Sequence, residues 1–540
     1  MKKFLHKAKA SLQDSSSQFP SAGHSSSSGH SSNPKFTKEE DSPSSIRPPS
    51  PDDLLRYRYH HGTNLGSVFV LEKWLSGSMF VKGANGGSEL DAVNASLKAN
   101  GLDGTRAKWE KHWNDAISDS DFDWLVNTAH CTTIRLPIGY FTLGPNFTSG
   151  TPFAGQPAQV YVNAWSAVKN LTARARAHGI GILLDLHALP GGANKDSHSG
   201  TSNKQAGLWS SKSHLSLSQH CLVYMAQEAK AMDGVVGIQL LNEAGWNAPG
   251  MYQWYDSVIA AISQVDPTMP LYISDAWNLA PALEYSNKKN SLNNGLGSNP
   301  VVVDTHKYYT FSDADKSQSP QQIIGKIPGA LDAQNGKEGN VVDHGAGQVI
   351  VGEYSCTLDG QTWSKVSDGE RPGLTVQFGR AQSQLWQQRT GGSYFWTYKM
   401  DWMPGGDWGF VANTNNKAIP PPPGLLLSKQ DISSRLSSAH SRREDQKTGA
   451  LTNHSNYWDS TAKGKQFQHN RFADGFDVGF SDAMAFFEGK DSIAGGNKIG
   501  MLDLWLRKRV LESGQGGEFV WEWEQGFRQG VGAFYSAAGV

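Results

Sequence analysis

The chain has 540 residues, with 49 Lys and Arg against 50 Asp and Glu, so its formal net charge is -1. This length allows one large domain with additional segments. The balance of charges gives no electrostatic reason to expect nucleic acid or an anionic membrane surface as a partner. We therefore expect an uncharged partner, and the 18 Trp residues suit stacking against flat apolar faces.

Two features of the sequence indicate a reducing compartment. Cys131, Cys221 and Cys356 are far apart and odd in number, which argues against a disulfide framework. The start, Met1-Lys-Lys-Phe-Leu-His-Lys, carries charges where a signal peptide needs an apolar stretch, and no run of about 18 apolar residues occurs. The expectation is a cytoplasmic protein without a membrane span. A short basic amphipathic anchor at residues 1–11 is the alternative.

Composition divides the chain into four parts. Residues 1–56 are rich in Ser and Pro, and such a segment buries too little apolar surface to fold, which predicts a disordered tail. Residues 57–415 alternate apolar runs with helical stretches. Residues 416–465 contain four consecutive prolines and then mostly polar residues, which predicts a linker. Residues 466–540 have apolar residues at helical spacing and predict an appended helical segment.

The second part contains eight candidate buried strands. Most are continuous β-branched or aliphatic runs, as expected for parallel strands covered on both faces. Helical stretches at 162–178 and 252–265 lie between them, which indicates a parallel β/α architecture. Eight units without a Gly-x-Gly-x-x-Gly after the first strand favour a (β/α)8 TIM barrel over an open doubly wound sheet. The strands are expected at 59–65, 131–137, 180–187, 236–243, 271–275, 301–306, 349–353 and 393–396.

Six of the eight predicted strands end in side chains suited to chemistry. The βα loops of a barrel converge at the carboxyl ends of the strands, where reactive groups belong. One carboxylate there is usually a helix cap or a surface ion pair. Two carboxylates, Glu243 and Glu353, come directly after apolar strands. Placing an ionised carboxylate there costs free energy, which is expected only where the group has a function. The other strand-end residues are Arg135, His187, Asn242, His306 with Tyr308, and Trp396.

Two carboxylates that face each other are what cleavage of a glycosidic bond requires, because one protonates the leaving oxygen while the other meets the oxocarbenium charge. Asn242 is either a strand-end turn residue or a hydrogen-bonding partner of a sugar 2-hydroxyl. Asp185, His187 and His306 are also acceptable zinc ligands, although no His-x-x-x-His or Cys-x-x-Cys spacing accompanies them. A nucleophilic serine is disfavoured because no suitable Gly-x-Ser-x-Gly elbow occurs.

Taken in chain order, these residues resemble the active site of glycoside hydrolase family 5, over residues 57 to 410. That family combines an Arg, a His, an Asn-Glu pair, a His-x-Tyr, a Glu and a Trp. The closer similarity is to the fungal exo-β-1,3-glucanases. It rests on Gly62-Thr-Asn-Leu-Gly-Ser-Val-Phe-Val-Leu-Glu72-Lys-Trp74, Arg135-Leu-Pro-Ile-Gly-Tyr140 and Asp185-Leu-His-Ala-Leu-Pro-Gly191.

The resemblance implies a retaining β-glycosidase that works by double displacement without a cofactor. Glu353 would attack the anomeric carbon, and Glu243, its pKa raised by the nearby charge of Glu353, would act first as acid and then as base. Arg135 would keep Glu353 ionised, and Tyr308 would hydrogen-bond it. Contacts to the sugar or to the acid/base are implied for Glu72, His187, Asn242, His306 and Trp396.

The sequence departs from the family pattern in several places. Ala244-Gly-Trp246 follows the Asn-Glu pair, where the family commonly has Pro. The secreted glucanases have a signal peptide and disulfides, and neither is expected for this sequence. A cytoplasmic enzyme is not expected to meet wall glucan, which favours a β-glucoside, a short β-1,3-glucan oligosaccharide or a glucolipid headgroup as the substrate. A segment beyond Pro423, which includes Trp521-Glu-Trp523-Glu, has no counterpart in them. The alternative from another class is a catalytically silent barrel that binds glycan or acts as a scaffold. The oligomeric state stays open.

Overall fold

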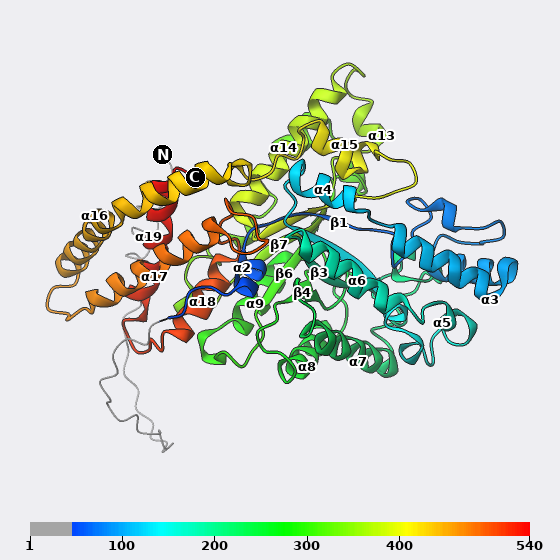
Figure 1. Ribbon diagram of the computed structural model, residues 1–540, viewed down its shortest axis with the longest axis horizontal. Coiled ribbons are helices and arrows are strands. Elements are labelled where there is room, and N and C mark those ends of the chain that lie inside the picture. The colour runs from blue at the N-terminus through cyan, green and yellow to red at the C-terminus, as the bar shows by residue number, and fades with distance from the viewer. Residues whose placement is uncertain (1–45) are drawn as a thin grey trace. The chain divides into compact units, whose positions relative to one another are not determined.

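Eight parallel strands close into a barrel in the computed structural model, which describes residues 46–540 (Figure 1). Each strand pairs with the next, and β8 returns to pair with β1. All eight predicted strands are present, and nearly every strand residue is buried because the barrel is filled inside and covered by helices outside. The strands are β1 (His60–Asn64), β2 (Thr133–Gly139), β3 (Gly181–Ala188), β4 (Val235–Gln239), β5 (Leu271–Ser274), β6 (Val301–Lys307), β7 (Val349–Tyr354) and β8 (Gly392–Phe395).

Helices between the strands form the outer layer, and the two stretches predicted at 162–178 and 252–265 are confirmed as α6 and α8. The predicted (β/α)8 architecture is therefore confirmed. Before and within the barrel lie α2 (Pro51–Tyr57), α3 (Glu89–Asp115), α4 (Asp119–Asn127), α5 (Gln156–Val160), α6 (Ala164–Ala177), α7 (Lys212–Ala229), α8 (Met251–Ser263), α9 (Leu279–Lys289), α10 (Asp313–Lys316), α11 (Pro320–Lys326), α12 (Val341–His344), α13 (Gly360–Trp363), α14 (Arg371–Arg389) and α15 (Phe410–Asn415). Short 3-10 helices are η1 (Gly77–Met79), η2 (Tyr140–Leu143), η3 (Pro145–Phe147), η4 (Ser197–Ser199), η5 (Leu292–Asn294), η6 (Ile327–Gly329), η7 (Asp332–Gln334), η8 (Gly406–Trp408) and η9 (Pro423–Leu426).

The structure corrects the predicted tail at its end. Residues 51–57 form α2, which begins at a capping box in which the Ser50 side chain accepts from the Asp53 N–H and the Asp53 side chain accepts from the Ser50 N–H. Leu54, Leu55 and Tyr57 of this helix are buried, which explains why it is ordered despite the polar sequence before it. Residues 1–45, with the proposed anchor at 1–11, lie outside the described residues.

The structure also corrects the predicted linker at 416–465. Residues 429–461 form α16 (Lys429–Thr461), which starts at a capping box between Ser428 and Asp431. Only Ile432, Ala439 and His454 of this 33-residue helix are buried. The polar composition that suggested a linker therefore belongs to a largely exposed helix.

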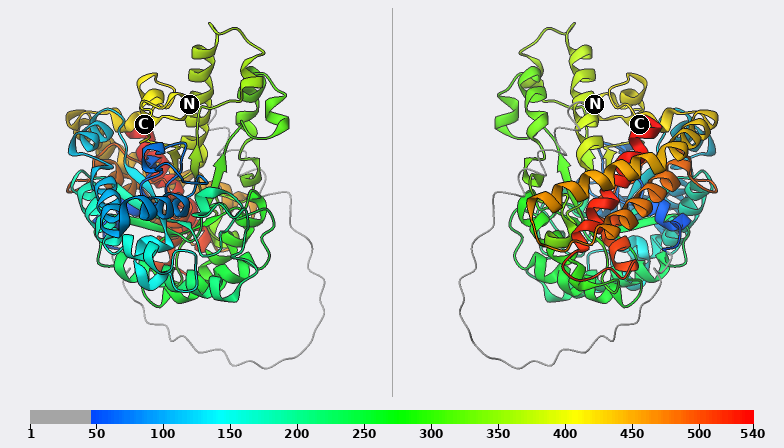
Figure 2. Two further views of the ribbon diagram at one scale, coloured as in Figure 1. Left: turned by 90° about the vertical axis from the view of Figure 1, so that its right-hand side faces the viewer. Right: turned by 90° about the vertical axis from the view of Figure 1, so that its left-hand side faces the viewer.

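The C-terminal segment is helical, as predicted, and its helices lie together on one side of the barrel (Figure 2). They are α16, α17 (His469–Glu488), α18 (Leu502–Glu512) and α19 (Val520–Ala538). Helices α17 and α19 approach closely through glycines. A Cβ on Gly479 would lie 2.1 Å from the Phe527 carbonyl oxygen, and one on Gly530 would lie 2.1 Å from that of Phe476. Only glycine allows these two backbones to come so near.

The chain between α17 and α18 attaches the C-terminal helices to the amino ends of the strands. The Tyr59 N–H, just before β1, donates to the Lys498 carbonyl at 3.0 Å, and the Gly500 N–H donates to the Tyr57 carbonyl at 2.9 Å. Trp505 of α18 packs against Tyr57 of α2 with ring centroids 5.1 Å apart. The C-terminal segment therefore lies at the end of the barrel opposite to the carboxyl ends of the strands.

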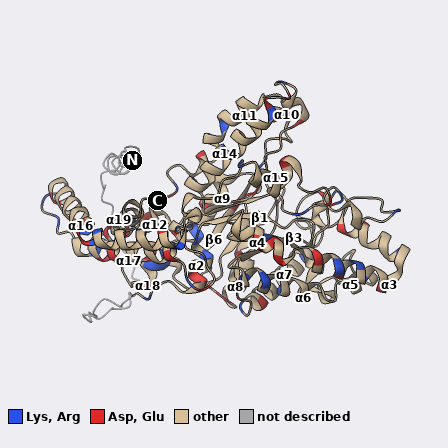
Figure 3. Ribbon diagram, turned by 45° about the horizontal axis from the view of Figure 1, so that its top comes forward, with Lys and Arg blue, Asp and Glu red and all other residues tan. Residues whose placement is uncertain are grey.

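Three properties of the described residues bear on the expected compartment and partners. Cys131, Cys221 and Cys356 are free and buried, which confirms that they form no disulfide framework. A membrane-spanning helix needs about 20 apolar residues, and no helix within residues 46–540 meets that length and hydropathy. Figure 3 shows basic and acidic residues interspersed over the helices, in agreement with the balanced net charge.

Candidate active site

The two glutamates singled out from the sequence meet at the carboxyl ends of the strands. Glu243 follows β4 and Glu353 lies in β7. One carboxylate oxygen of each lies within 4.8 Å of the other, and His306 of β6 lies between them. Retaining glycosidases hold their two carboxyl groups about 5 to 5.5 Å apart, whereas inverting enzymes leave about 6.5 to 9.5 Å for a water. The short separation matches the retaining geometry.

Hydrogen bonds fix both oxygens of Glu353. Arg135 Nη1 donates to Oε1 at 2.9 Å, and the Tyr308 hydroxyl donates to Oε2 at 2.8 Å. Burial raises the pKa of Glu353, and the positive charges of His306 and Arg135 oppose that rise. Arg135 is fully buried and also forms an ion pair with Asp185 at 3.1 Å. These donors orient the Glu353 carboxylate and favour its ionised form, as the resemblance implied.

Glu243 lies between two imidazoles. His306 Nδ1 is 2.7 Å from its Oε1, and His198 Nε2 is 3.3 Å from its Oε2. Burial acts to raise the pKa of Glu243, but the hydrogen bond with His306 and the positive charges of His306 and His198 outweigh it and hold the pKa at about 2. The expected rise in this pKa is therefore wrong for the site without substrate, because two neighbouring histidines contribute more than Glu353 does.

His306 is hydrogen-bonded on both sides. Its Nε2 lies 3.1 Å from Asp304 Oδ2, while Nδ1 faces Glu243 at 2.7 Å and Glu353 at 3.5 Å. Burial lowers the pKa of His306, but the charges of Glu353 and Asp304 and the hydrogen bond to Glu243 raise it well above its usual value. In the free site the proton shared by Glu243 and His306 therefore rests mainly on the imidazole.

His187 and Trp396 form a second side of the site. Their rings are stacked, with centroids 5.8 Å apart and planes inclined by 12°. His187 Nδ1 lies 2.7 Å from Asp185 Oδ2, and burial lowers the pKa of His187 well below its usual value, so this ring is neutral. The sequence offered Asp185, His187 and His306 as a possible set of zinc ligands. His306 faces Glu243, so the three side chains do not converge on one point.

The remaining predicted residues belong to the same site. Asn242 Oδ1 accepts from Arg135 Nη2 at 2.7 Å, and its amide nitrogen lies 3.4 Å from His187 Nε2. Glu72, in the loop after β1, accepts from the indole N–H of Trp74 at 2.9 Å. Burial raises the pKa of Glu72 to about 7, and the charges of Glu353 and Glu243 add to that rise. This electrostatic influence places Glu72 close to Glu353 and Glu243.

Several residues of the site were not predicted from the sequence. Asn64 Oδ1 and Gln239 Oε1 each accept from Arg135 at 2.9 Å. Asp304 lies two positions before His306 on β6, and residues two apart on a strand share a face, so the sequence held a signal for it. His198 lies in η4 within a long loop, where no periodicity or strand end marks it.

The backbone after β4 explains how Glu243 is positioned without the proline common in the family. Glu243 has φ 45°, a left-handed conformation that is uncommon for residues other than glycine. Its carbonyl accepts from the Asn194 side chain at 2.9 Å, and the Ala244 N–H donates to Ser274 Oγ at 3.3 Å. Side chains from the loop after β3 and from the end of β5 therefore hold this turn.

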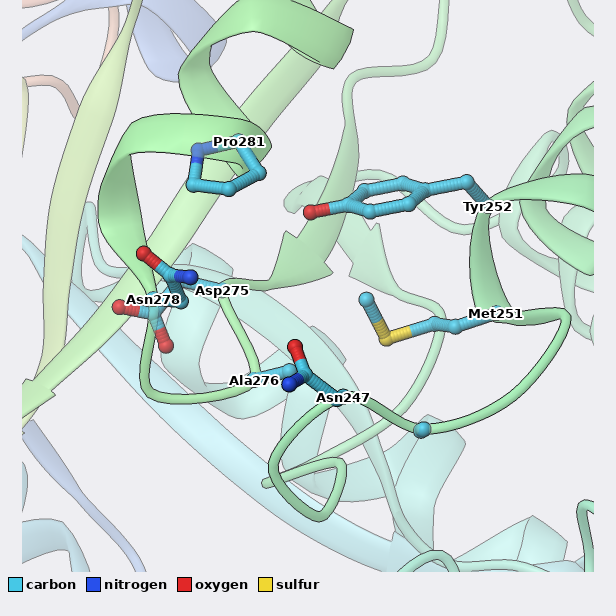
Figure 4. A pocket seen from close by; sticks show the side chains of 8 residues that line it. Asn247, Met251, Tyr252, Asp275, Ala276, Asn278 and Pro281 are labelled. Carbon is cyan, nitrogen blue, oxygen red and sulfur yellow. The ribbon is translucent and has the colours of Figure 1, made fainter.

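A cavity of about 190 Å³ lies beside this turn, between the loops that follow β4 and β5. Figure 4 shows the Tyr252 ring and the Met251 side chain facing Asp275 and Asn278 across it. Asn247 and Ala276 line it from the two loops, and both have positive φ. The cavity therefore adjoins the loop that carries Glu243.

A closed (β/α)8 barrel with two adjacent carboxylates at the carboxyl ends of its strands has the geometry of a retaining glycoside hydrolase. Residues 91–377 match the family model described as cellulase (glycosyl hydrolase family 5), and residues 439–538 match the one described as the glucan 1,3-beta-glucosidase 3 C-terminal domain. The chain belongs to glycosyl hydrolase family 5. It is a retaining β-glycosidase, and the resemblance seen in the sequence is confirmed.

Relatives match this chain through the C-terminal segment as well as the barrel. It is 31% identical over 509 residues to an uncharacterized glycosyl hydrolase of Saccharomyces cerevisiae, covering 90% of this chain and 94% of that protein. It is 30% identical over 478 residues to glucan 1,3-beta-glucosidase 3 of Schizosaccharomyces pombe, covering 88% and 94%. The crystal structure of rutinosidase from Aspergillus niger shares the fold, with a TM-score of 0.50 and 17% identity over 68% of this chain and 99% of that one.

Proposed function

We propose that this enzyme hydrolyses β-glucosidic bonds of β-1,3-linked gluco-oligosaccharides or other small β-glucosides, with Glu353 as nucleophile and Glu243 as acid/base. The observation that carries the proposal is the pair of carboxylates within 4.8 Å, of which one is held by Arg135 and Tyr308 and the other faces His306. The name of the Schizosaccharomyces pombe relative supports the choice of a β-glucan type of substrate.

In the first step the Glu353 carboxylate attacks the anomeric carbon and the bond to the leaving oxygen breaks. That oxygen takes a proton from Glu243, which receives it through the 2.7 Å hydrogen bond with His306 Nδ1. The products of the step are a covalent glycosyl ester on Glu353 and a free alcohol. His306, held by Asp304 on its other side, is a positioning residue that supplies the proton.

In the second step Glu243, now ionised, removes a proton from water as the water attacks the anomeric carbon. The ester bond to Glu353 breaks, and glucose leaves with the β configuration. Asn242 adjoins Glu243 and is held by Arg135, which suits a hydrogen bond to the sugar 2-hydroxyl. Trp396 and Glu72 are proposed to contact the glucose ring and its hydroxyls.

Exposed aromatic side chains support a substrate with a flat ring beyond the scissile bond. They are 42% to 64% exposed, although large aromatic side chains are usually more buried. Each lies in a loop after the carboxyl end of a strand, the end of the barrel that carries the two glutamates. Such rings stack against the apolar face of a sugar or against an apolar aglycone. The residues are Trp74, Trp246, Trp277, Phe311 and Trp402.

We propose a cytoplasmic location for the enzyme. The support is the three buried thiols without a disulfide, since thiols stay reduced in the cytosol and tend to pair in oxidising compartments. A cytoplasmic enzyme meets small glucosides and glucolipid headgroups more readily than a wall polymer. Recovery of the full-length protein in the cytosolic fraction of its cell is the expected result, and recovery from the medium or wall would contradict the location.

The test is hydrolysis of aryl β-glucosides and laminari-oligosaccharides by the wild type, Glu353→Gln and Glu243→Gln. Glu353→Gln is expected to lower kcat at least about 10³-fold on every substrate, because the nucleophile is gone. Glu243→Gln is expected to lower kcat about 10²- to 10⁴-fold on oligosaccharides and much less on aryl glucosides with acidic phenols, which leave without protonation. Glu444→Gln, on the exposed face of α16, is the control. No turnover of any β-glycoside by the wild type would favour a silent barrel.

A further inference from the structure

The C-terminal helices contain a second convergence of histidine and carboxylate side chains, which the glycosidase mechanism does not use. Glu522 of α19 accepts on Oε2 from His454 Nε2 at 3.0 Å and from His469 Nδ1 at 2.8 Å. Its Oε1 accepts from the Gln468 N–H at 2.8 Å. The three facing atoms lie within 4.8 Å of one another. We call His454, His469 and Glu522 the C-terminal triad.

His469 faces a carboxylate at each of its two ring nitrogens. Its Nδ1 faces Glu522, and its Nε2 lies 3.2 Å from Asp459 Oδ1 of α16. A neutral imidazole has one N–H, so it can donate to only one of these two carboxylates. A cation bound at Nδ1 leaves Nε2–H free to donate to Asp459, so this arrangement satisfies both contacts.

The surroundings favour a cation at this point. The Glu522 side chain is fully buried, and a buried carboxylate is costly unless positive charge compensates it. The His454 ring stacks on Phe472 at 4.2 Å, and the Trp521 ring lies 6.0 Å from it, so an apolar wall adjoins the polar atoms. Metal-binding histidines in proteins usually have this arrangement, with the second ring nitrogen donating to a carboxylate.

We propose that the C-terminal triad binds a divalent transition metal of the zinc type through His454 Nε2, His469 Nδ1 and Glu522 Oε2, with Asp459 orienting His469. Two histidines and a glutamate are a known zinc ligand set that leaves one position for water. Zinc bonds of about 2.0 to 2.1 Å place tetrahedral ligand atoms about 3.3 Å apart. The His–Glu separations of 3.0 and 2.8 Å must therefore widen by about 0.3 to 0.5 Å, which side-chain rotation allows.

The metal would have a structural role that the fold explains. Helix α16 buries only Ile432, Ala439 and His454, so His454 is the one buried residue of its second half. That half is otherwise attached through half-buried side chains, by the ion pair of Lys447 with Asp477 and by Trp458, which packs against Trp521. A metal shared by α16, the start of α17 and α19 would fasten that half to the helices that pack against the barrel. The expected consequence is slower amide exchange over residues 445–461 when metal is bound.

The experiment measures zinc binding to the full-length, chelator-treated protein by calorimetry and native mass spectrometry. All variants carry Glu353→Gln, because Glu243, His306 and Glu353 are the other set of described residues whose ligand atoms converge. One zinc per chain is expected for the parent. Addition of His454→Gln is expected to weaken binding at least about 100-fold, and Asp459→Asn about 10- to 100-fold. His440→Gln, on the exposed face of α16, is expected to bind like the parent.

Circular dichroism establishes that each variant is folded, and Asp459→Asn keeps the test valid if His454→Gln does not fold, because Asp459 is largely exposed. Zinc-dependent protection of residues 445–461, lost with the Asp459→Asn change, would support the site. Equal zinc binding by the parent, the His454→Gln variant and the Asp459→Asn variant, or no zinc bound by the parent, would overturn the proposal.

Discussion

Glu243 and Glu353 have the same carboxyl group, and their different neighbours suit them to the two roles proposed for them. Glu353 accepts from Arg135 and Tyr308, which fix its direction and favour a charged nucleophile. Glu243 instead faces His306 and His198, whose raised pKa values keep both imidazoles protonated near neutral pH. Glu353, held by fixed donors, is suited to forming a bond to carbon. Glu243, next to two imidazoles, is suited to proton transfer.

His198 provides a prediction about stability and pH. Burial alone would lower the pKa of His198, but the ion pair with Asp196 at 3.8 Å and the charges of Glu243, Glu72 and Glu353 raise it from 6.5 to about 9. A histidine with a raised pKa stabilises the fold fully below its unfolded pKa, and that contribution is lost as the pH rises towards about 9.

The measurement is the free energy of unfolding of the wild type and of His198→Gln between pH 6 and pH 10. The advantage of the wild type is expected to shrink as the pH rises from about 6.5 to about 9. His214→Gln, in α7 outside the site, is the control and is expected to show no such trend. A difference between wild type and His198→Gln that does not change with pH would refute the charged state assigned to His198.

At the scale of single elements, the glycines between α17 and α19 set how closely these helices pack. A Cβ at position 479 would meet the backbone carbonyl of Phe527 at 2.1 Å, which no side-chain movement relieves. Gly479→Ala is therefore expected to destabilise the protein by about 1 to 3 kcal/mol. Gly532→Ala, in α19 with nothing near its Cβ, is expected to stabilise by about 0.5 to 1 kcal/mol. Urea unfolding of both variants measures the effects, and equal effects would contradict this packing.

The strands were predictable because burial on both faces leaves continuous apolar runs, and eight of the nine predicted site residues followed from those strand ends. The ninth, Glu72, came from the resemblance to the fungal glucanases. His198 was not predictable in this way, since its position depends on how a loop folds over the barrel. Helix α16 was missed because an exposed helix leaves a polar sequence, and its capping box at Ser428 was the one local signal.

The Trp521-Glu-Trp523-Glu stretch now has a physical explanation. Glu522 accepts from His454 and His469, while Trp523 is buried and its carbonyl meets Gly475 of α17. Glu524 accepts from the backbone N–H groups of Val341 and Val342, which satisfies the first turn of α12. These partners come from distant parts of the chain, so the sequence pattern alone did not reveal them.

At the scale of the whole molecule, the barrel and the C-terminal helices share one hydrophobic cluster. Leu183 and Tyr272 of the barrel belong to the same cluster as Phe480 and Trp505. Trp505→Ala is expected to cost about 3 to 5 kcal/mol, because it empties a fully buried site between α2, α17 and α18. Loss of glycosidase activity and loss of helical circular dichroism in urea are expected at one midpoint in wild type and variant alike. Two separate midpoints would contradict a shared core.

Glu353 and Glu243 are proposed to cleave β-glucosidic bonds with retention of configuration. The most direct measurement is the proton NMR spectrum of the glucose that the wild type releases from an aryl β-glucoside, recorded before mutarotation. A carboxylate separation within 4.8 Å predicts that β-glucose forms first and that the α-anomer grows in later. Release of α-glucose as the first product would mean that water attacks directly, and would contradict the role assigned to Glu353.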